Sequence, residues 1–128
     1  MTTPQIIAHR GASYLAPENT LVAFRKAMEI GADGVEMDVQ KTYDNELVIH
    51  HDYMVDMHTD ISGQIYDLTM GELKALDFGS WKDAIYANER IATLQEALEL
   101  CAGMEARRYS WNWKSPLEDD PDFVPRVL

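Results

Sequence analysis

The chain has 128 residues, which is enough for one domain. Hydrophobic residues make up 46% of the sequence, and this predicts a packed core and excludes a disordered chain. Its 22 acidic and 11 basic residues give a net charge of −11, which argues against a general nucleic-acid binder because such a protein needs a basic surface.

The sequence carries no signal for secretion or membrane insertion. The N-terminus lacks the basic region and apolar run of a signal peptide, and no stretch approaches the roughly 18 apolar residues of a membrane span. Cys101 is the single cysteine, so neither a disulfide framework nor a cysteine-rich zinc site is expected. We therefore expect a cytoplasmic protein with no transmembrane segment.

The first predicted element is a buried strand over residues 5–8 that ends in His9, Arg10 and Gly11. A histidine at a strand end is most often a structural hydrogen-bonding residue, but the arginine beside it suggests a site. Arginine offers a planar fork for phosphate oxygens, and histidine moves protons near neutral pH. The glycine allows a sharp turn or a close approach to a ligand.

A helix and a second strand are predicted next. Asn19 is expected to be the N-cap of the helix, and Gly31 is expected to end it. Residues 33–40 then alternate between apolar and polar side chains, which is typical of a strand with two different faces. A strand, a helix and a strand in this order imply two parallel strands joined by a right-handed crossover.

Glu36 and Asp38 project from the same face of the second predicted strand, about 6–7 Å apart. From this strand alone, a solvated face is an equally good interpretation. Two carboxylates on one face of an apolar strand are unfavourable unless a cation lies between them, and a divalent metal with oxygen ligands fits that role.

A turn at Asp44 and Asn45 leads to a third predicted strand over residues 47–52, which ends in His51 and Asp52. In parallel α/β folds, ligands bind at this end of the strands. Three successive strands would then carry polar pairs to comparable positions, and packing alone does not explain that arrangement.

Five short segments follow one another in a distinctive order: His9-Arg10-Gly11, Pro17-Glu18-Asn19-Thr20, Gly31-Ala32-Asp33, Glu36-Met37-Asp38 and His51-Asp52. In this order they resemble the signature of the glycerophosphodiester phosphodiesterase family. The resemblance covers roughly residues 5–100. It implies an α/β fold, the N-terminal half of a (β/α)8 barrel with a capping insertion.

The resemblance also implies a function and a set of site residues. The expected reaction is the metal-dependent hydrolysis of a glycerophosphodiester to glycerol 3-phosphate and an alcohol. By this resemblance His9 and His51 are the general acid/base pair, and Arg10 contacts the phosphate. Glu36 and Asp38 would be ligands of the metal, Mg²⁺ or Ca²⁺.

The segment over about residues 53–89 is long for a connection between a strand and a helix. The resemblance implies an insertion that caps the site, and a plain surface loop is the alternative. Met57 stands where the family often has an arginine, so a phosphate or structural contact is expected to be missing there.

Two threonines predict the N-termini of helices in the second half of the chain. Thr69 with Glu72, and Thr93 with Glu96, have the spacing of capping boxes. Gly103 is expected to end the second of these helices. Cys101 in that helix is interpreted as a core residue and not as a nucleophile.

The last predicted strand alternates Ser110, Asn112 and Lys114 with aromatic residues. The resemblance aligns Asn112 with a glutamate that binds the metal, and Lys114 with a lysine near the substrate phosphate. An asparagine oxygen can bind a cation but brings no negative charge, so Asn112 is expected to be a weak third ligand. Asp120 and Pro121 predict the start of a further helix.

A complete barrel of this type needs about 250 residues, so residues 1–128 are expected to form a partial domain. Two alternatives to catalysis therefore stay open. The chain could bind metal or phosphodiester without turnover, as a truncated relative, or it could be an interaction fragment that completes a barrel with another chain. The exposed strand edges of half a barrel also predict a homo-oligomer or a strand-swapped assembly.

Overall fold

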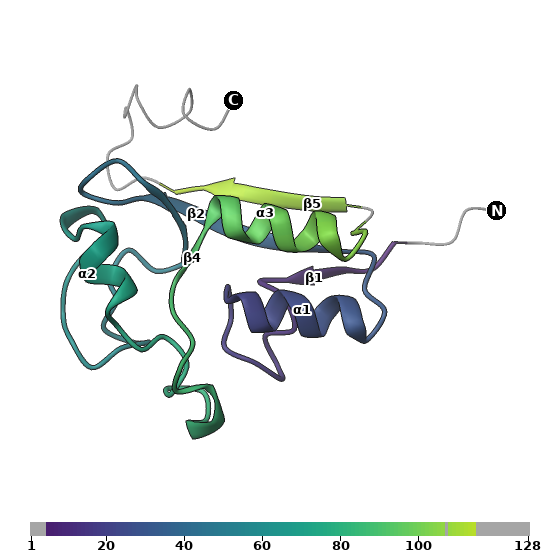
Figure 1. Cartoon of the computed structure of the whole chain (residues 1–128), viewed down its shortest axis with the longest axis horizontal. Coiled ribbons are helices and arrows are strands. Elements are labelled where there is room, and N and C mark those ends of the chain that lie inside the picture. The colour runs from purple at the N-terminus through teal and green to yellow at the C-terminus, as the bar shows by residue number, and fades with distance from the viewer. Residues whose placement is uncertain (1–4, 107, 115–128) are drawn as a thin grey trace.

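The computed structural model describes residues 5–106 and 108–114 (Figure 1). The helix predicted to start at Asp120 lies outside these residues. The strands are β1 (Ile7–His9), β2 (Gly34–Lys41), β3 (Leu47–Ile49), β4 (Ala92–Thr93) and β5 (Arg108–Trp113). The α-helices are α1 (Leu21–Glu29), α2 (Met70–Lys74) and α3 (Leu94–Gly103), and two short 3-10 helices are η1 (Ile65–Asp67) and η2 (Ala84–Tyr86).

The sheet is organised around β2. On one side, β1 runs parallel to β2 with His9 opposite Glu36. On the other side, β5 also runs parallel, with Asn112 opposite Asp38. The crossover through α1 therefore joins parallel strands, as predicted, and the register places His9 beside Glu36 and Asn112 beside Asp38.

The strand predicted over residues 47–52 differs from the structure in direction and length. β3 ends at Ile49 and runs antiparallel to β2, so the third parallel strand is β5. The physical reason is the short turn between β2 and β3, because a connection of a few residues can join only antiparallel strands. The reversal nevertheless carries the chain back beside β2, where the His50 N–H donates to the Asp38 carbonyl oxygen at 2.9 Å.

The main core lies between one face of the sheet and the helices α1 and α3, which pack side by side on that face (Figure 1). Val35, Met37 and Val39 of β2 are fully buried there. Phe24 of α1 and Cys101 of α3 pack against them, and Cys101 is a free thiol, as the core interpretation predicted. Glu36, Asp38 and Gln40 project from the opposite face because strand side chains alternate.

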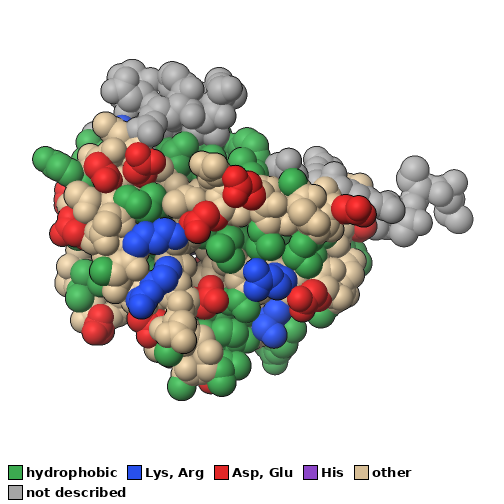
Figure 2. Space-filling model, in the orientation of Figure 1, with side chains coloured by type: hydrophobic (Ala, Val, Ile, Leu, Met, Phe, Trp, Pro, Cys, Tyr) green, Lys and Arg blue, Asp and Glu red, His purple; other side chains and the backbone are tan. Residues whose placement is uncertain are grey.

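Figure 2 views the side of the molecule covered by α1 and α3. Hydrophobic side chains are exposed there among acidic and basic ones, and no histidine is visible on this face. Within the described part of the chain, no helix has the length and apolar character that crossing a membrane requires.

The start of α1 differs from the prediction by one residue. Thr20 is the N-cap, and its hydroxyl accepts from the Ala23 N–H. Asn19 has a left-handed backbone with φ 58° and sends its side chain to Asp38 instead. Asparagine is favoured both as an N-cap and in the left-handed conformation. The residue preference of Asn19 therefore did not show which of the two positions it would occupy.

Helix α1 ends as predicted, with Gly31 in the left-handed conformation at φ 98°. The Gly31 N–H donates to the Met28 carbonyl at 3.2 Å, and the Ala32 N–H donates to the Ala27 carbonyl at 3.0 Å, as in a Schellman motif. Helix α3 ends at Gly103, as predicted, and here Glu105 takes the left-handed position at φ 58°.

The insertion that follows β3 has its own small core. Both predicted capping boxes are present, at Thr69 with Glu72 and at Thr93 with Glu96. The buried residues of this second cluster are Val48, Val55, Ile65, Leu73, Phe78 and Ile91. A strap of two hydrogen bonds ties the insertion to the loop after β1: Lys82 Nζ donates to the Ser13 carbonyl at 3.0 Å, and the Tyr86 hydroxyl donates to the Leu15 carbonyl at 2.9 Å.

Two glycines with left-handed backbones provide a matched test of the turn after β1. Gly11 has φ 80°, and a Cβ added there would lie 2.7 Å from the Ala23 carbonyl carbon, whereas Gly31 has open space around it. We expect Gly31→Ala to cost about 1–2 kcal/mol from backbone strain alone. Gly11→Ala should cost about 1–3 kcal/mol more, because it also overpacks the loop against α1.

Urea unfolding followed by circular dichroism measures both variants. Equal losses of unfolding free energy would show that the loop moves away from α1 at little cost.

Candidate functional site at the carboxyl end of the parallel strands

The site begins where β1 ends. His9 is 67% exposed, and its Nε2 lies 3.1 Å from Oε2 of Glu36 on the neighbouring strand. The parallel register places these two residues opposite each other. His9 is therefore both accessible to a ligand and in contact with the carboxylate face of β2.

Arg10 turns back across the same face. Its left-handed backbone, with φ 58°, lets its N–H donate to the Glu36 carbonyl at 2.8 Å. The guanidinium then meets two carboxylates, with Nη1 2.7 Å from Glu18 Oε2 and Nε 3.3 Å from Asp38 Oδ2. These contacts fix the plane of the guanidinium and leave further N–H groups that can bind a phosphate.

The two carboxylates of β2 have different surroundings. Asp38 is 3% exposed, and Asn19 Nδ2 donates to its Oδ2 at 3.0 Å. Burial and the nearby Asp38 raise the pKa of Glu36 above its usual range. Its Oε2 is buried and makes no hydrogen bond, although His9 lies close by. A negatively charged pair with an unsatisfied oxygen is a place where a cation would be stabilised.

In β5, Asn112 lies opposite Asp38 of β2. Asn112 Nδ2 donates to Glu36 Oε1 at 3.1 Å, so the amide contacts the carboxylate it was predicted to join. Among residues 5–106 and 108–114, no three or more His, Cys, Asp or Glu side chains are grouped so that they could hold a metal ion. The possible donor set is therefore two carboxylates and one amide.

Lys114 lies beside His51 at the edge of the same face. Its N–H donates to the Val39 carbonyl at 2.9 Å, which continues the register of β5. Its Nζ is 5.5 Å from the centre of the Tyr53 ring. Lys114 and His51 line one cleft of about 510 Å³, together with Asp52, Tyr53, Met54, Asp56 and Met57.

His51 is held by its neighbours on both sides. Its Nδ1 lies 2.8 Å from Asp52 Oδ1, and a proton on Nδ1 leaves Nε2 available to accept or give a proton. Gln40 Nε2 donates to the carbonyl oxygens of His50 and Asp52, each at 2.7 Å. The buried amide of Gln40 is thus hydrogen-bonded to the backbone on both sides of His51.

Three residues of the site were not selected from the sequence as functional residues: Glu18, Gln40 and His58. Met57 is 75% exposed, while the following residue, His58, is buried and turns toward Glu18 and Asp52. Contact with His58, and then with Arg10, lowers the pKa of Glu18 to about 2 against the opposing effect of burial. Glu18 belongs to the Pro-Glu-Asn-Thr segment, so that motif was the one available signal for it.

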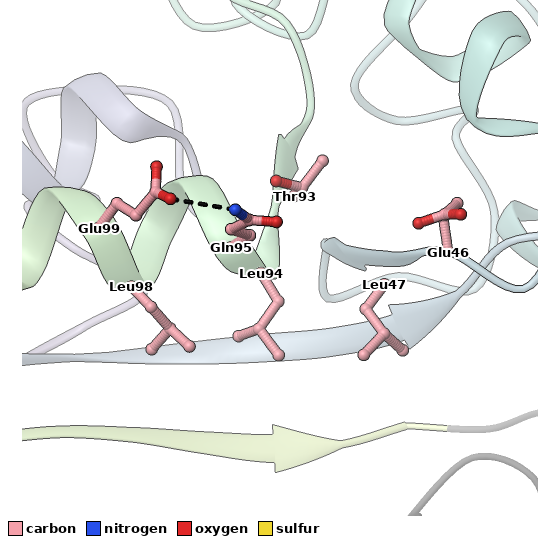
Figure 3. A pocket seen from close by; sticks show the side chains of 7 residues that line it. All are labelled: Glu46, Leu47, Thr93, Leu94, Gln95, Leu98 and Glu99. Carbon is pink, nitrogen blue, oxygen red and sulfur yellow. Dashed lines mark hydrogen bonds between the residues drawn. The ribbon is translucent and has the colours of Figure 1, made fainter. Parts of the chain in front are cut away.

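A second cleft, of about 370 Å³, lies at α3 and the start of β3 (Figure 3). Leu47, Leu94 and Leu98 line it, and Figure 3 shows acidic Glu46 and Glu99 among its other side chains. This cleft contains no basic or histidine side chain, and its acidic groups would repel a phosphodiester. It is therefore not the candidate site.

The sequence of the chain matches a known family over most of its length. Residues 9–121 match the Glycerophosphoryl diester phosphodiesterase family. The chain belongs to this family. Its relatives include a glycerophosphodiester phosphodiesterase of Caldanaerobacter subterraneus subsp. tengcongensis, 52% identical over 95 residues that cover 74% of this chain and 39% of that protein. Glycerophosphodiester phosphodiesterase 1 of Rattus norvegicus is 45% identical over 97 residues, or 74% of this chain and 29% of that protein.

Solved structures of the family share the fold. A phosphodiesterase of Oleispira antarctica, solved in complex with the product sn-glycerol-3-phosphate, has a TM-score of 0.92 and 39% identity. The match covers 97% of this chain and 50% of that one. A glycerophosphodiester phosphodiesterase of Agrobacterium tumefaciens has a TM-score of 0.83 and 32% identity, covering 88% of this chain and 48% of that one.

The predicted fold class is confirmed: the chain has the α/β fold of the N-terminal half of the family's (β/α)8 barrel. It spans less than half the length of the two curated relatives above and half of the first solved structure.

The buried His50 predicts a specific pH dependence of stability. Burial first, and then the nearby His58, lowers the pKa of His50 from 6.5 to about 4. The unfolded chain therefore takes up this proton at a higher pH than the folded chain does. Stability should fall as the pH drops from 6.5 to 4, by up to about 3 kcal/mol from this residue.

His50→Gln should flatten the dependence in that window, because glutamine keeps a donor near the Met54 carbonyl but does not titrate. Urea unfolding at a series of pH values measures it. Glu18 does not interfere above pH 4.5, since its contribution is lost only as the pH falls from there toward 2. An unchanged slope in His50→Gln would contradict the assignment.

Proposed function

We propose that this chain carries the phosphate-binding and proton-transfer half of an enzyme that hydrolyses glycerophosphodiesters to glycerol 3-phosphate and an alcohol. One observation carries the proposal. Arg10 and the accessible His9 contact the carboxylate pair of β2, and Gln40, on the same face of β2, binds the backbone on both sides of His51. The names of the relatives, and the product bound to the Oleispira antarctica enzyme, support this substrate class.

The two histidines have different roles in proton transfer. One accepts a proton from the attacking hydroxyl or water, and the other gives a proton to the leaving alkoxide. Asp52 orients His51, while Glu36 contacts His9. Arg10 and Lys114 lie where they can bind phosphate oxygens, and their charges stabilise the negative charge that develops there.

We also propose that Glu36 and Asp38 hold a divalent cation, Mg²⁺ or Ca²⁺, with Asn112 as a weak third ligand. The unsatisfied Glu36 Oε2 and the effect of Asp38 on the Glu36 pKa support a cation at this position. When bound, the metal would neutralise charge on the phosphoryl oxygens. A cytoplasmic location is part of the same proposal, and the single, buried cysteine is compatible with a reducing compartment.

A second candidate function rests on the sheet edges. In the described part of the chain, β1 and β5 each pair with β2 alone. Such edges are templates for pairing with another chain. The chain could then act as an interaction fragment that binds metal or phosphodiester without turnover.

Both histidines should be essential in any preparation that hydrolyses a glycerophosphodiester. We expect His9→Ala and His51→Ala each to lower kcat by about 10²–10⁴-fold, because each removes a positioned acid or base. Release of glycerol 3-phosphate measures the rate, and Gln95→Ala on α3, away from the site, is the control. Near-normal turnover in either histidine variant would remove that residue from the mechanism.

The cation site predicts a change in binding and in stability. Calorimetry with Mg²⁺ and Ca²⁺ should show binding that Glu36→Ala abolishes and that Glu99→Ala, on α3, preserves. Asn112→Glu should lower the Tm without metal, because it places a third carboxylate beside Glu36, and should raise the Tm with metal. If Glu36→Ala and the wild type bind equally, the cation lies elsewhere or is absent.

Self-association of the chain in solution tests whether its unpaired strand edges bind another chain. The 128-residue chain should form dimers or larger species, because unpaired parallel edges are otherwise exposed, and its turnover as a monomer should be low. Light scattering coupled to size exclusion, run beside the hydrolysis assay, gives the mass and the activity. A compact monomer with the turnover of its relatives would contradict this prediction.

A further inference from the structure

His58 occupies an unusual place for a residue of the insertion. Its side chain is 9% exposed, and each ring nitrogen faces a carboxylate. Nε2 lies 3.5 Å from Glu18 Oε1, and Nδ1 lies 3.7 Å from Asp52 Oδ2. Nδ1 is buried and makes no hydrogen bond at this distance.

Each of these carboxylates already holds one residue of the candidate site. Glu18 binds Arg10 at 2.7 Å through its other oxygen, Oε2. Asp52 contacts His51 at 2.8 Å through its other oxygen, Oδ1. His58 therefore lies between two pairs, Glu18–Arg10 and Asp52–His51, and faces the oxygen of each that its partner does not use.

Neighbouring rings fix the orientation of the imidazole. The His50 ring packs edge-on to it, with centroids 4.9 Å apart and an interplanar angle of 82°. The Trp81 ring packs in the same manner, at 4.6 Å and 85°. Trp81 is anchored in turn, because its Nε1 donates to the Phe78 carbonyl at 2.8 Å.

The chemistry of the ring explains why a histidine suits this position. A neutral imidazole has one donor and one acceptor, whereas an imidazolium donates from both nitrogens. Only a ring with a proton on each nitrogen can donate to a carboxylate on each side at the same time. A buried donor shared by two carboxylates also offsets their mutual repulsion.

We propose that His58 is a positioning residue that holds Arg10 through Glu18 and His51 through Asp52, so that the phosphate-binding and proton-transfer groups keep a fixed separation. The role of this separation rests on the proposed function, but the contacts themselves do not. His58 touches none of the reacting atoms in this arrangement. It links the insertion to the loop after β1, and its effect reaches the site only through the two carboxylates.

Three substitutions separate the two contacts. His58→Gln places an amide nitrogen near the position of Nε2 and can serve Glu18 alone. His58→Asn places one near Nδ1 and can serve Asp52 alone. His58→Phe keeps an aromatic ring between His50 and Trp81 but has no donor, so it should release both partners.

Nuclear magnetic resonance of the full, ligand-free chain reads out each partner separately. The order parameter of the Arg10 Nη1–H groups, which face Glu18, reports the Glu18 side, and the ring tautomer of His51 reports the Asp52 side. We expect His58→Phe to lower the order parameter of Arg10 and to give His51 a mixture of its two ring tautomers. His58→Gln should restore only the Arg10 signal, and His58→Asn should restore only the His51 signal.

A matched control excludes a general loosening of the insertion. Val55→Ala removes packing from the same small core without removing a donor. The proposal is overturned if Arg10 and His51 are unchanged in His58→Phe, or if neither amide restores its partner. It is also overturned if Val55→Ala, at the same loss of thermal stability, changes both signals as much as His58→Phe.

Binding of sn-glycerol 3-phosphate, measured by calorimetry on the same samples, keeps this inference distinct from the proposed function. If the wild type binds it, His58→Phe should bind about tenfold more weakly, a difference of about 1.4 kcal/mol. Wild type that fails to bind would count against the proposed function, while the resonance signals still decide the role of His58.

Discussion

The buried carboxylate of Asp38 is the constraint on which the rest of this structure depends. A charged group at 3% exposure in the middle of a sheet is stable only if partners surround it. Arg10 and Asn19 supply those partners, and both adopt left-handed backbones with φ 58°. The loop after β1 is therefore shaped by a residue of β2, and the same contacts bring Glu18 and Arg10 over the carboxylate face.

Much of this arrangement could be predicted from local sequence. The alternation over residues 33–40 correctly separated the buried Val35 and Met37 from the polar Glu36 and Asp38, because the period of a strand is fixed by its geometry. The two capping boxes were also predictable, since threonine and glutamate three residues apart satisfy each other's backbone groups. The family resemblance named the remaining residues of the site.

What the sequence did not reveal depends on distant contacts. His58 and Glu18 are far apart in the chain and meet only because the insertion folds back over the loop after β1. The alternation placed Gln40 on the polar face of its strand. It did not predict the hydrogen bonds from Gln40 to the backbone around His51, because these form only when the chain reverses into β3. The direction of β3 was predictable from the sequence, because the short turn before it allows only an antiparallel pair.

The strap between the insertion and the loop after β1 has a consequence for sequence variation. Lys82 and Tyr86 donate to backbone carbonyl oxygens of Ser13 and Leu15, and every residue type has such an oxygen. Tyr14 between them is 91% exposed. Residues 13–15 can therefore change their side chains, or carry an attached fluorophore at position 14, while both hydrogen bonds of the strap are kept.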